Sequence, residues 1–246
     1  MGYHESLTEG RNAVLEAFRS GKTVDRLFVL DGCQDGPVKT ILREAKKQDT
    51  MVQYVKKERL DQLSETKNHQ GVIAYCAACE YAEVSDILEN AKKKGEAPFI
   101  VLLDGIEDPH NLGAIIRTAN QAGAHGVIIP KRRAVGLTAT VARTSAGAVN
   151  YTPVAKVTNL VTVMEDLKKE GMWFVCADMD GEEMYSLNLK GPIGLVIGNE
   201  GEGVSRLVRE ACDFTASIPM KGDIDSLNAS VAAGVLAYEI VRQRLG

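Results

Sequence analysis

Two patterns of apolar residues alternate along this chain. One pattern predicts helices and the other predicts strands. In the first third, apolar residues spaced three or four apart predict helices, and short apolar runs predict strands. The expected helices are 11–18, 37–47 and 56–63, and the expected strands are 26–30, 52–55 and 71–75. This pattern predicts a small α/β domain at the start of the chain.

From Phe99 onward, continuous apolar runs alternate with amphipathic segments. The expected strands are 99–103, 126–129, 173–177, 193–197 and 214–218, and the expected helices lie near 112–122, 138–146, 159–170, 204–211 and 227–244. This alternation is typical of a parallel sheet that is covered by helices on both faces. The second part of the chain is therefore expected to be a larger α/β domain.

A polar segment separates the two patterns. It contains Lys92-Lys93-Lys94-Gly95 and ends at Pro98, although Val84, Ile87, Leu88 and Ala91 have helical spacing. We expect three parts in the chain, with a first domain at 1–78, a linker at 79–97 and a second domain at 98–246.

Composition narrows the class of protein. With 246 residues and 45% hydrophobic content, the chain can bury a core, and a net charge of -4 argues against a uniformly basic nucleic-acid coat. No apolar run approaches the roughly 20 residues of a membrane span, and residues 1–5 lack a signal-peptide pattern. Five scattered cysteines suit reduced thiols without disulfides. We therefore expect a soluble, cytoplasmic protein.

Three polar or glycine-rich segments each follow an expected strand and lead into an expected helix. They are 108–119, 198–203 and 226–230. Ligands of parallel α/β sheets bind at the carboxyl ends of the strands, where helix N-termini attract anions. The three segments therefore predict one composite site.

The first segment offers Asn111 and Arg117. Asn111 could simply cap the helix, and Arg117 could be a solvated surface residue. Positions 113, 116, 117 and 120 share one helical face, however, so Arg117 is expected to face the same side as Gly113. Gly113 would permit close backbone approach, and Arg117 could bind a phosphate with its planar guanidinium.

The other two segments are open to two interpretations each. Gly198–Gly203 lacks the Lys-Ser/Thr ending of a P-loop, and its Glu200 and Glu202 would repel a triphosphate. The loop is either a tight turn or a backbone cradle for a neutral or zwitterionic ligand, and its late position disfavours a nicotinamide-dependent oxidoreductase. Ser226 and Asn228 could cap the last helix, contact a ligand, or do both.

Other chemistry is excluded or weak. None of the four histidines lies near a Gly-x-Ser-x-Gly motif, which disfavours a serine hydrolase. The pair Cys76 and Cys79 has no second pair, so we predict no metal site. A set of basic residues is expected to face RNA, although short charge runs are often only solvated; it comprises Arg11, Lys67, Arg132, Arg133 and Arg143.

Together the three segments resemble the motifs of the SpoU family of RNA ribose 2′-O-methyltransferases, in the SPOUT superfamily. The motifs match as Asn111–Arg117, as Ile197–Gly203, and as Ile218–Met220 with Ser226–Ala232. Residues 4–76 are similar to the substrate-binding domain of the family, which has an L30e-like fold. The two-domain layout favours a guanosine of 23S rRNA as substrate; the alternatives are tRNA ribose methylation and a noncatalytic RNA-binding or ribosome-assembly protein.

The resemblance implies S-adenosyl-L-methionine as cofactor, a deep trefoil knot in the second domain, and an active site shared across a homodimer. By analogy, the cofactor would contact Gly198, Ile218 and Leu227, together with Ile197 and Met220. The catalytic polar residues would be Arg117, Asn111, Glu200, Ser226 and Asn228.

The reaction is an in-line methyl transfer to a ribose 2′-oxygen, which requires alignment of the two atoms and loss of the hydroxyl proton. Arg117 should stay protonated, so we expect it to bind phosphate and stabilise the developing alkoxide. Glu200 would orient Arg117 or Asn111, and Ser226 and Asn228 would position the nucleotide.

Overall fold

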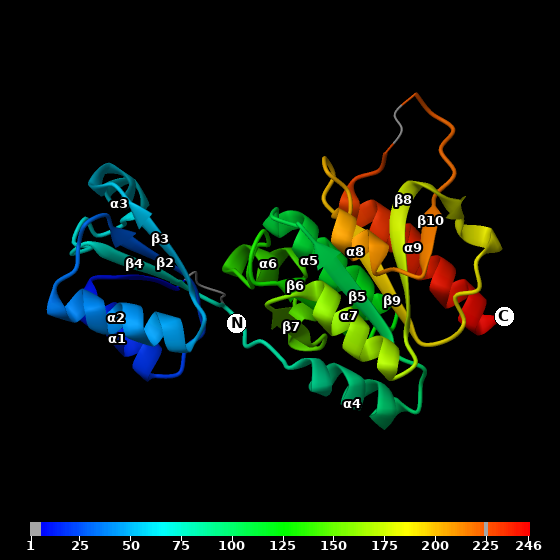
Figure 1. Cartoon of the computed structure of the whole chain (residues 1–246), viewed down its shortest axis with the longest axis horizontal. Helices are drawn as coiled ribbons and strands as arrows, with labels where there is room; N and C mark the ends of the chain where they lie inside the picture. The colour runs from blue at the N-terminus through cyan, green and yellow to red at the C-terminus, as the bar shows by residue number, and fades with distance from the viewer. Residues whose placement is uncertain (1–5, 224–225) are drawn as a thin grey trace. The chain divides into compact units, whose positions relative to one another are not determined.

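The computed structural model describes residues 6–223 and 226–246 and divides into two compact units (Figure 1). The first unit runs to Glu80 and includes Gly136–Ala139, and the second holds Tyr81–Val135 and Thr140–Gly246. The expectation that residues 1–5 lack a signal-peptide pattern concerns residues outside the described part of the chain.

The first unit is a four-stranded sheet with three helices. Its elements are β1 (Ser6–Glu9), α1 (Arg11–Arg19), β2 (Val24–Leu30), α2 (Gly36–Lys47), β3 (Met51–Val55), α3 (Lys57–Leu63) and β4 (Val72–Cys76). The strand order is β1-β4-β2-β3, and only the β2–β3 pair is parallel. The expected small α/β domain is confirmed, with β1 as an additional edge strand.

Apolar residues on both faces of this sheet are buried. Val14 of α1 and Ile41 of α2 pack with Leu27 of β2 on one face. On the other face, Leu60 of α3 packs with Phe28 of β2. The short helix α3 therefore lies on the second face, opposite α1 and α2.

The second unit contains the remaining elements. They are α4 (Val84–Lys94), β5 (Phe99–Asp104), α5 (Pro109–Gln121), β6 (Gly126–Pro130), α6 (Ala139–Thr144), β7 (Val154–Val157), α7 (Leu160–Lys169), β8 (Trp173–Glu183), β9 (Ile193–Gly198), α8 (Arg206–Glu210), β10 (Phe214–Ser217) and α9 (Ala229–Leu245), with short 3-10 helices at Ala148–Asn150 and Met184–Ser186. All pairs in the sheet, whose order is β10-β8-β9-β5-β6-β7, are parallel. The predicted parallel sheet is confirmed.

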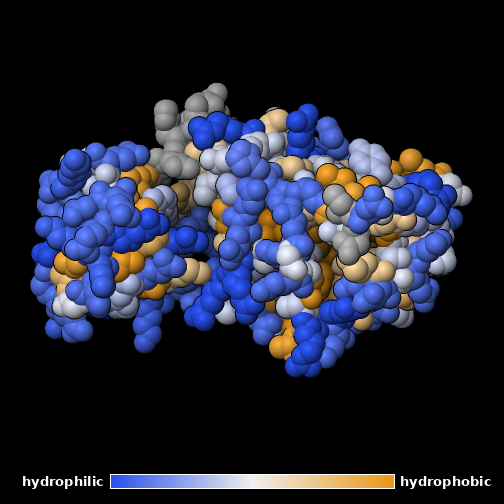
Figure 2. Space-filling model, turned by 90° about the horizontal axis from the view of Figure 1, so that it is seen from above, coloured by the Kyte–Doolittle hydropathy of each residue, from blue (hydrophilic) through white to orange (hydrophobic). Residues whose placement is uncertain are grey.

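Helices cover both faces of this sheet (Figure 1). Ile87 of α4, Met164 of α7 and Val208 of α8 share one core with strand residues such as Phe174. On the opposite face, α9 packs against β8, β9 and α5. In the space-filling view, hydrophilic residues cover most of the visible surface and apolar residues reach it in patches (Figure 2).

The segment expected as a linker at 79–97 mostly belongs to the second unit, because it contains α4. Glu83 and Asp86 form a capping box at its start, and Gly95 ends it with a positive φ of 66°. A Cβ on Gly126 would lie 2.5 Å from Ile87, so α4 packs tightly on β6. The helical spacing in this polar segment therefore marks a helix; β7, like β1 and α4, is an element that was not predicted.

A buried histidine joins α4 to the sheet. His125 is fully buried; its Nδ1 accepts a hydrogen bond of 3.0 Å from the backbone N–H of Phe99, and its Nε2 lies 3.0 Å from Glu96. Because Nδ1 accepts, the neutral ring carries its proton on Nε2 and donates it to Glu96. Burial lowers the pKa of His125 and outweighs the Glu96 contact, which raises it.

We expect acid to destabilise the protein partly through this residue. The unfolded pKa of histidine is about 6.5, so the stabilising contribution of the neutral His125 is complete above that pH and is lost as the pH falls below it. His125→Asn can still accept from Phe99 but does not titrate. In urea unfolding, it should lose less stability between about pH 7.5 and about pH 5.5 than the unmodified chain.

The exposed His110 provides the control. His110→Asn should retain the pH dependence of the unmodified chain. If the free energy of unfolding fell equally with pH in all three proteins, His125 would have no part in acid sensitivity.

Candidate active site

A cavity of about 470 Å³ lies at the carboxyl ends of β9 and β10 and beside the middle of β8. Its volume falls within the range of small-molecule sites. All five residues that the resemblance assigned to the cofactor line it, namely Ile197, Gly198, Ile218, Met220 and Leu227. Glu200 and Ser226 line it as well. The structure therefore brings residues from two of the three motifs to one cavity.

The loop Gly198–Gly203 is closed by its own backbone. Asn199 and Gly203 exchange two backbone hydrogen bonds of 3.1 and 2.8 Å, and the Asn199 side chain donates to the carbonyl of Gly105 at 3.0 Å. A Cβ on Gly198 would lie 2.1 Å from the backbone carbon of Gly203 and 2.3 Å from the nitrogen of Val204. Glycine at 198 is therefore required for this loop to close.

Glu200 joins the first and third motifs. Its Oε1 accepts hydrogen bonds from the side-chain amide of Asn111 at 3.1 Å, from the backbone N–H of Ala229 at 3.2 Å, and from Asn228. Asn228 also donates to Oδ1 of Asn111 at 3.0 Å. The two amides and the carboxylate thus form one network, which holds three distant segments of the chain together.

Asn228 has two roles in this arrangement. It is the N-cap of α9, because its Oδ1 accepts from the backbone N–H groups of Ser230 and Val231 at 3.0 and 3.3 Å. Its Nδ2 remains available for Asn111 and Glu200. The cap therefore fixes the direction of the amide within the network, and the helix-cap interpretation of this residue is confirmed.

The start of α5 differs from the expectation. Asp108 is the N-cap and accepts from the N–H of His110 at 2.8 Å, so Asn111 lies in the first turn and does not cap the helix. Gly113 does not face a ligand either: a Cβ there would lie 1.8 Å from Oγ1 of Thr144. Glycine at 113 is needed for close packing of α5 against the end of α6.

Arg117 lies apart from the network. It is exposed on α5, and within the described residues it neither lines the cavity nor contacts Glu200. Six helical residues separate it from Asn111, which corresponds to about 9 Å along the axis and about 120° around it. Of the two partners expected for Glu200, the described residues show a contact with Asn111 and none with Arg117 within one chain.

Sequence reasoning missed the middle of β8, which extends to Glu183, beyond the expected strand 173–177, and it also missed a residue of α8. Asp178, Met179 and Asp180 line the cavity, as does Arg209. Arg209 forms an ion pair of 2.8 Å with Asp178, which also accepts from the N–H of Asp180 at 3.0 Å. The position of acidic residues just after a buried strand was the available signal.

The basic residues expected to face RNA have different surroundings. Arg132, Arg133 and Arg143 of the second unit are exposed, and Arg133 lines a smaller cavity of about 290 Å³ beside Glu202. In the first unit, Lys67 is exposed, whereas the guanidinium of Arg11 forms an ion pair of 2.5 Å with Asp35. Arg11 is thus held by its own domain.

Among residues 6–223 and 226–246, no three His, Cys, Asp or Glu side chains form a group that could hold a metal ion. In the same described part of the chain, no helix combines the length and the apolar character of a membrane span.

Two family models match the chain. The SpoU rRNA methylase family matches residues 98–238, which hold the cavity and the network. The chain belongs to this family. A second model, RNA 2′-O ribose methyltransferase substrate binding, matches residues 7–82 of this SpoU protein. The predicted family and enzyme class are therefore confirmed.

Relatives agree with this assignment over nearly the whole length of the SpoU chain. YacO of Bacillus subtilis, named as a TrmH family tRNA/rRNA methyltransferase, is 49% identical over 96% of this chain and 94% of its own. A protein of Staphylococcus haemolyticus with the same family name is 46% identical, again over 96% and 94%. The SpoU methyltransferase AviRb from Streptomyces viridochromogenes, solved with AdoMet, has a TM-score of 0.62 and 28% identity over 98% of this chain and 91% of its own.

Proposed function

We propose that the cavity binds S-adenosylmethionine and that the Asn111–Glu200–Asn228 network forms the adjoining site for the ribose whose 2′-hydroxyl is methylated. The observation that supports this proposal is that two of the motifs line one cavity, while all three join in one adjoining hydrogen-bonded network. The AdoMet-bound AviRb structure supports the choice of cofactor. A pure RNA-binding protein would not need such a cavity.

The chain would hold the cofactor with the closed Gly198–Gly203 loop and with apolar residues such as Ile218 and Leu227. When bound, S-adenosylmethionine supplies an electrophilic methyl group on a sulfonium. Because Gly198 has no side chain, the loop can close, and its backbone groups would then be available to the cofactor.

The residues of the network would align the ribose. The carboxylate of Glu200 is fixed by three donors, so it cannot rotate without breaking these bonds. Asn111 and Asn228 are thereby preorganised, which lowers the entropic cost of positioning the hydroxyl for in-line attack. Ser226 lies at the cavity wall, where it can contact the nucleotide.

The substrate we propose is a guanosine ribose of 23S rRNA, with tRNA as the second candidate. The two-domain layout and the substrate-binding match at 7–82 support an RNA substrate, and curated relatives are named for both tRNA and rRNA. Labelled S-adenosylmethionine and total RNA from a strain lacking the protein would identify the target, because new 2′-O-methylation can be mapped in both RNA classes. No new methylated ribose in any RNA would overturn the proposal.

We also propose that the protein is a homodimer that pairs through α9. Val231, Tyr238 and Leu245 are exposed apolar residues at intervals of seven on this helix, with exposed fractions of 49%, 49% and 85%. Residues seven apart share one helical face, and such a stripe is typical of helix pairing. A second copy could bring its Arg117 to the network, since α5 and α9 pack together.

Charge on the α9 stripe should therefore separate the subunits. We expect Tyr238→Lys combined with Val231→Lys to give monomers in light scattering, because like charges and lost apolar burial oppose pairing. Leu207→Lys, on α8, is the control, since Leu207 is also exposed and lies outside the stripe. An unchanged dimer in the double variant, or a monomer in the control, would contradict pairing through α9.

The trefoil knot and the cytoplasmic location remain part of this proposal. Support for the knot comes from three chain segments, at 197–203, 218–220 and 226–232, that meet at one cavity. Support for the location comes from the RNA substrate and from five cysteines with free thiols.

A further inference from the structure

The loop that follows α3 in the first unit has an unusual backbone. Between Leu63 and Val72, two residues other than glycine have positive φ angles, Lys67 at 58° and Gln70 at 50°, and Gly71 follows at 84°. Residues other than glycine adopt this conformation mainly where their surroundings enforce it, and such positions often serve function.

Glu9, at the end of β1, holds the start of this loop. Its carboxylate accepts hydrogen bonds from the backbone N–H groups of Glu65 and Thr66 at 2.7 and 3.2 Å, and from the hydroxyls of Thr66 at 2.8 Å and Ser64. Burial opposes ionisation of Glu9, but these hydrogen bonds outweigh it and lower the pKa. The ionised carboxylate therefore anchors the loop.

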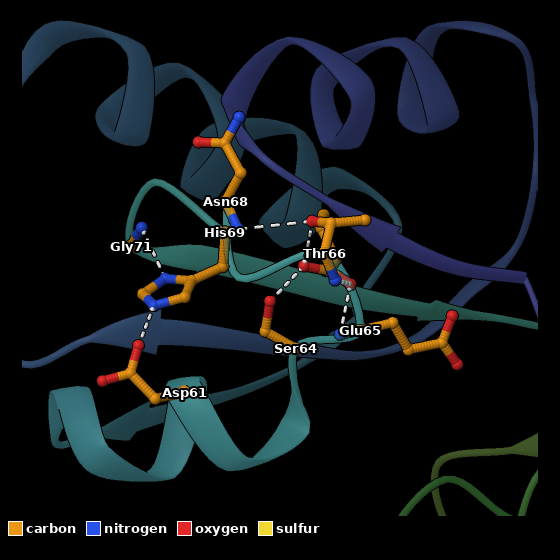
Figure 3. A network of polar contacts seen from close by, with 8 residues as sticks. Asp61, Ser64, Glu65, Thr66, Asn68, His69 and Gly71 are labelled. Atoms are coloured by element: carbon orange, nitrogen blue, oxygen red, sulfur yellow. Dashed lines mark hydrogen bonds and ion pairs between the residues drawn. The ribbon is translucent and has the colours of Figure 1, made fainter.

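Arg11 and His69 hold the far end. The backbone N–H and Nε of Arg11 donate to the side chain and the carbonyl of Gln70 at 3.2 and 3.1 Å. The ring of His69 is buried, with one nitrogen accepting from the N–H of Gly71 at 3.0 Å and the other 3.0 Å from Asp61 (Figure 3). Both ends of the loop are thus tied to the domain.

The tip of the loop presents polar groups on this rigid support. Lys67 and Asn68 are both exposed, and the N–H of Asn68 is held by Oγ1 of Thr66 at 3.3 Å. An ammonium group and a side-chain amide on a fixed backbone suit a phosphate and an unpaired base of RNA. A preorganised loop also loses little conformational entropy on binding.

We propose that residues 65–68 form an RNA-contact loop in which Lys67 binds a backbone phosphate, and that Glu9 and Arg11 are positioning residues for it. This inference rests on the proposed function in taking RNA as the partner. It assigns Arg11 an internal role, in place of the direct RNA contact expected from the sequence.

The variant Glu9→Gln distinguishes two roles of Glu9 in RNA binding: positioning of the loop, and a long-range effect of its negative charge. Removing a carboxylate should strengthen RNA binding if only long-range charge matters. If Glu9 positions the loop, the substitution should instead weaken binding roughly five- to tenfold, because the loop loses its anchor. The assay is filter binding of the full chain to protein-free 23S rRNA and, separately, to unfractionated tRNA. Glu16→Gln, at an exposed position of α1, is the matched control and should bind at least as well as the unmodified chain.

Lys67→Asn tests the contact itself. Asparagine tolerates a positive φ, so the variant removes the charge without adding strain. The slope of log affinity against log salt should fall in magnitude by roughly 0.7 to 0.9, as for one lost phosphate contact. This variant also keeps the test decisive if Glu9→Gln unfolds the first unit. Lys22→Asn, at another exposed lysine of this unit, should change the slope less than Lys67→Asn does.

The results separate the inference from the proposed function. RNA binding by Glu9→Gln that equals or exceeds that of the unmodified chain would overturn the positioning role, and an unchanged salt slope in Lys67→Asn would overturn the contact. Failure of the unmodified chain to methylate either RNA would instead count against the proposed function, because binding is measured independently of methyl transfer.

Discussion

Replacement of Arg117 by alanine should reduce methyl transfer by roughly 100- to 1000-fold while leaving the affinity for S-adenosylmethionine nearly unchanged. Arg117 is exposed on α5 and does not line the cavity among the described residues, so the cofactor should not sense its loss. Its planar guanidinium has five N–H donors and can stabilise a phosphate or a developing alkoxide. Single-turnover methyl transfer and calorimetry with the cofactor would measure the two effects.

Arg206→Ala is the control, because Arg206 is an exposed arginine that pairs with Glu210 on α8. Arg206→Ala should retain both the rate of methyl transfer and the affinity for S-adenosylmethionine. Loss of cofactor binding in Arg117→Ala to the same degree as loss of methylation would contradict the proposed role.

Mixed dimers would show whether Arg117 acts on the partner's network. If Arg117 of one copy completes the site of the other, a dimer of one Arg117→Ala chain and one Asn228→Ala chain has one site with both defects and one intact site. Random mixing should then restore roughly a quarter of the unmodified activity, since half of the dimers are mixed. No restoration would place Arg117 and the network in the same chain.

Replacement of Gly198 by alanine should weaken cofactor binding by roughly 100-fold or more, because its Cβ would overlap the backbone of Gly203 and Val204. That contact is with main chain, so no side-chain rotation can relieve it. The loop would have to open, and the cavity wall would change shape. Calorimetry with S-adenosylmethionine would measure the loss.

Gly201→Ala is a matched control in the same loop. A Cβ at Gly201 would lie 3.5 Å from the side-chain oxygen of Asn199, an ordinary contact, so this variant should bind the cofactor nearly normally. Thermal unfolding of both variants would show whether the rest of the second unit stays folded. Cofactor binding by Gly198→Ala at the level of Gly201→Ala would rule out the proposed role of the loop.

Most elements of the fold were predictable because they depend on local periodicity. The buried strands Phe99–Asp104 and Ile193–Gly198 are continuous apolar runs, and their helices carry apolar residues at helical spacing. The short strands Ser6–Glu9 and Val154–Val157 were not predicted, since the first has a single apolar residue and a lysine interrupts the second. The helix Val84–Lys94 was assigned to a linker because its polar residues outnumber its apolar stripe.

The candidate site was predictable in its members but not in its connections. The position of the three motifs after three strands indicated that Asn111, Glu200 and Asn228 would meet, and they form one network. The orientation of Arg117 was not predictable in this way, because helical spacing shows which residues share a face and not which element covers that face. Asp178 was missed for the same reason, since its partner Arg209 lies on another element.

By itself, the sequence determined the alternation of strands and helices, the three motifs and the family that they resemble, because each depends on residue type and short-range spacing. The tertiary structure decided which interpretation of each residue holds. It showed Gly113 packing against Thr144, and Arg11 anchoring a loop of its own domain. The reason is physical: contacts between residues far apart in the chain depend on how whole elements pack, which no local pattern contains.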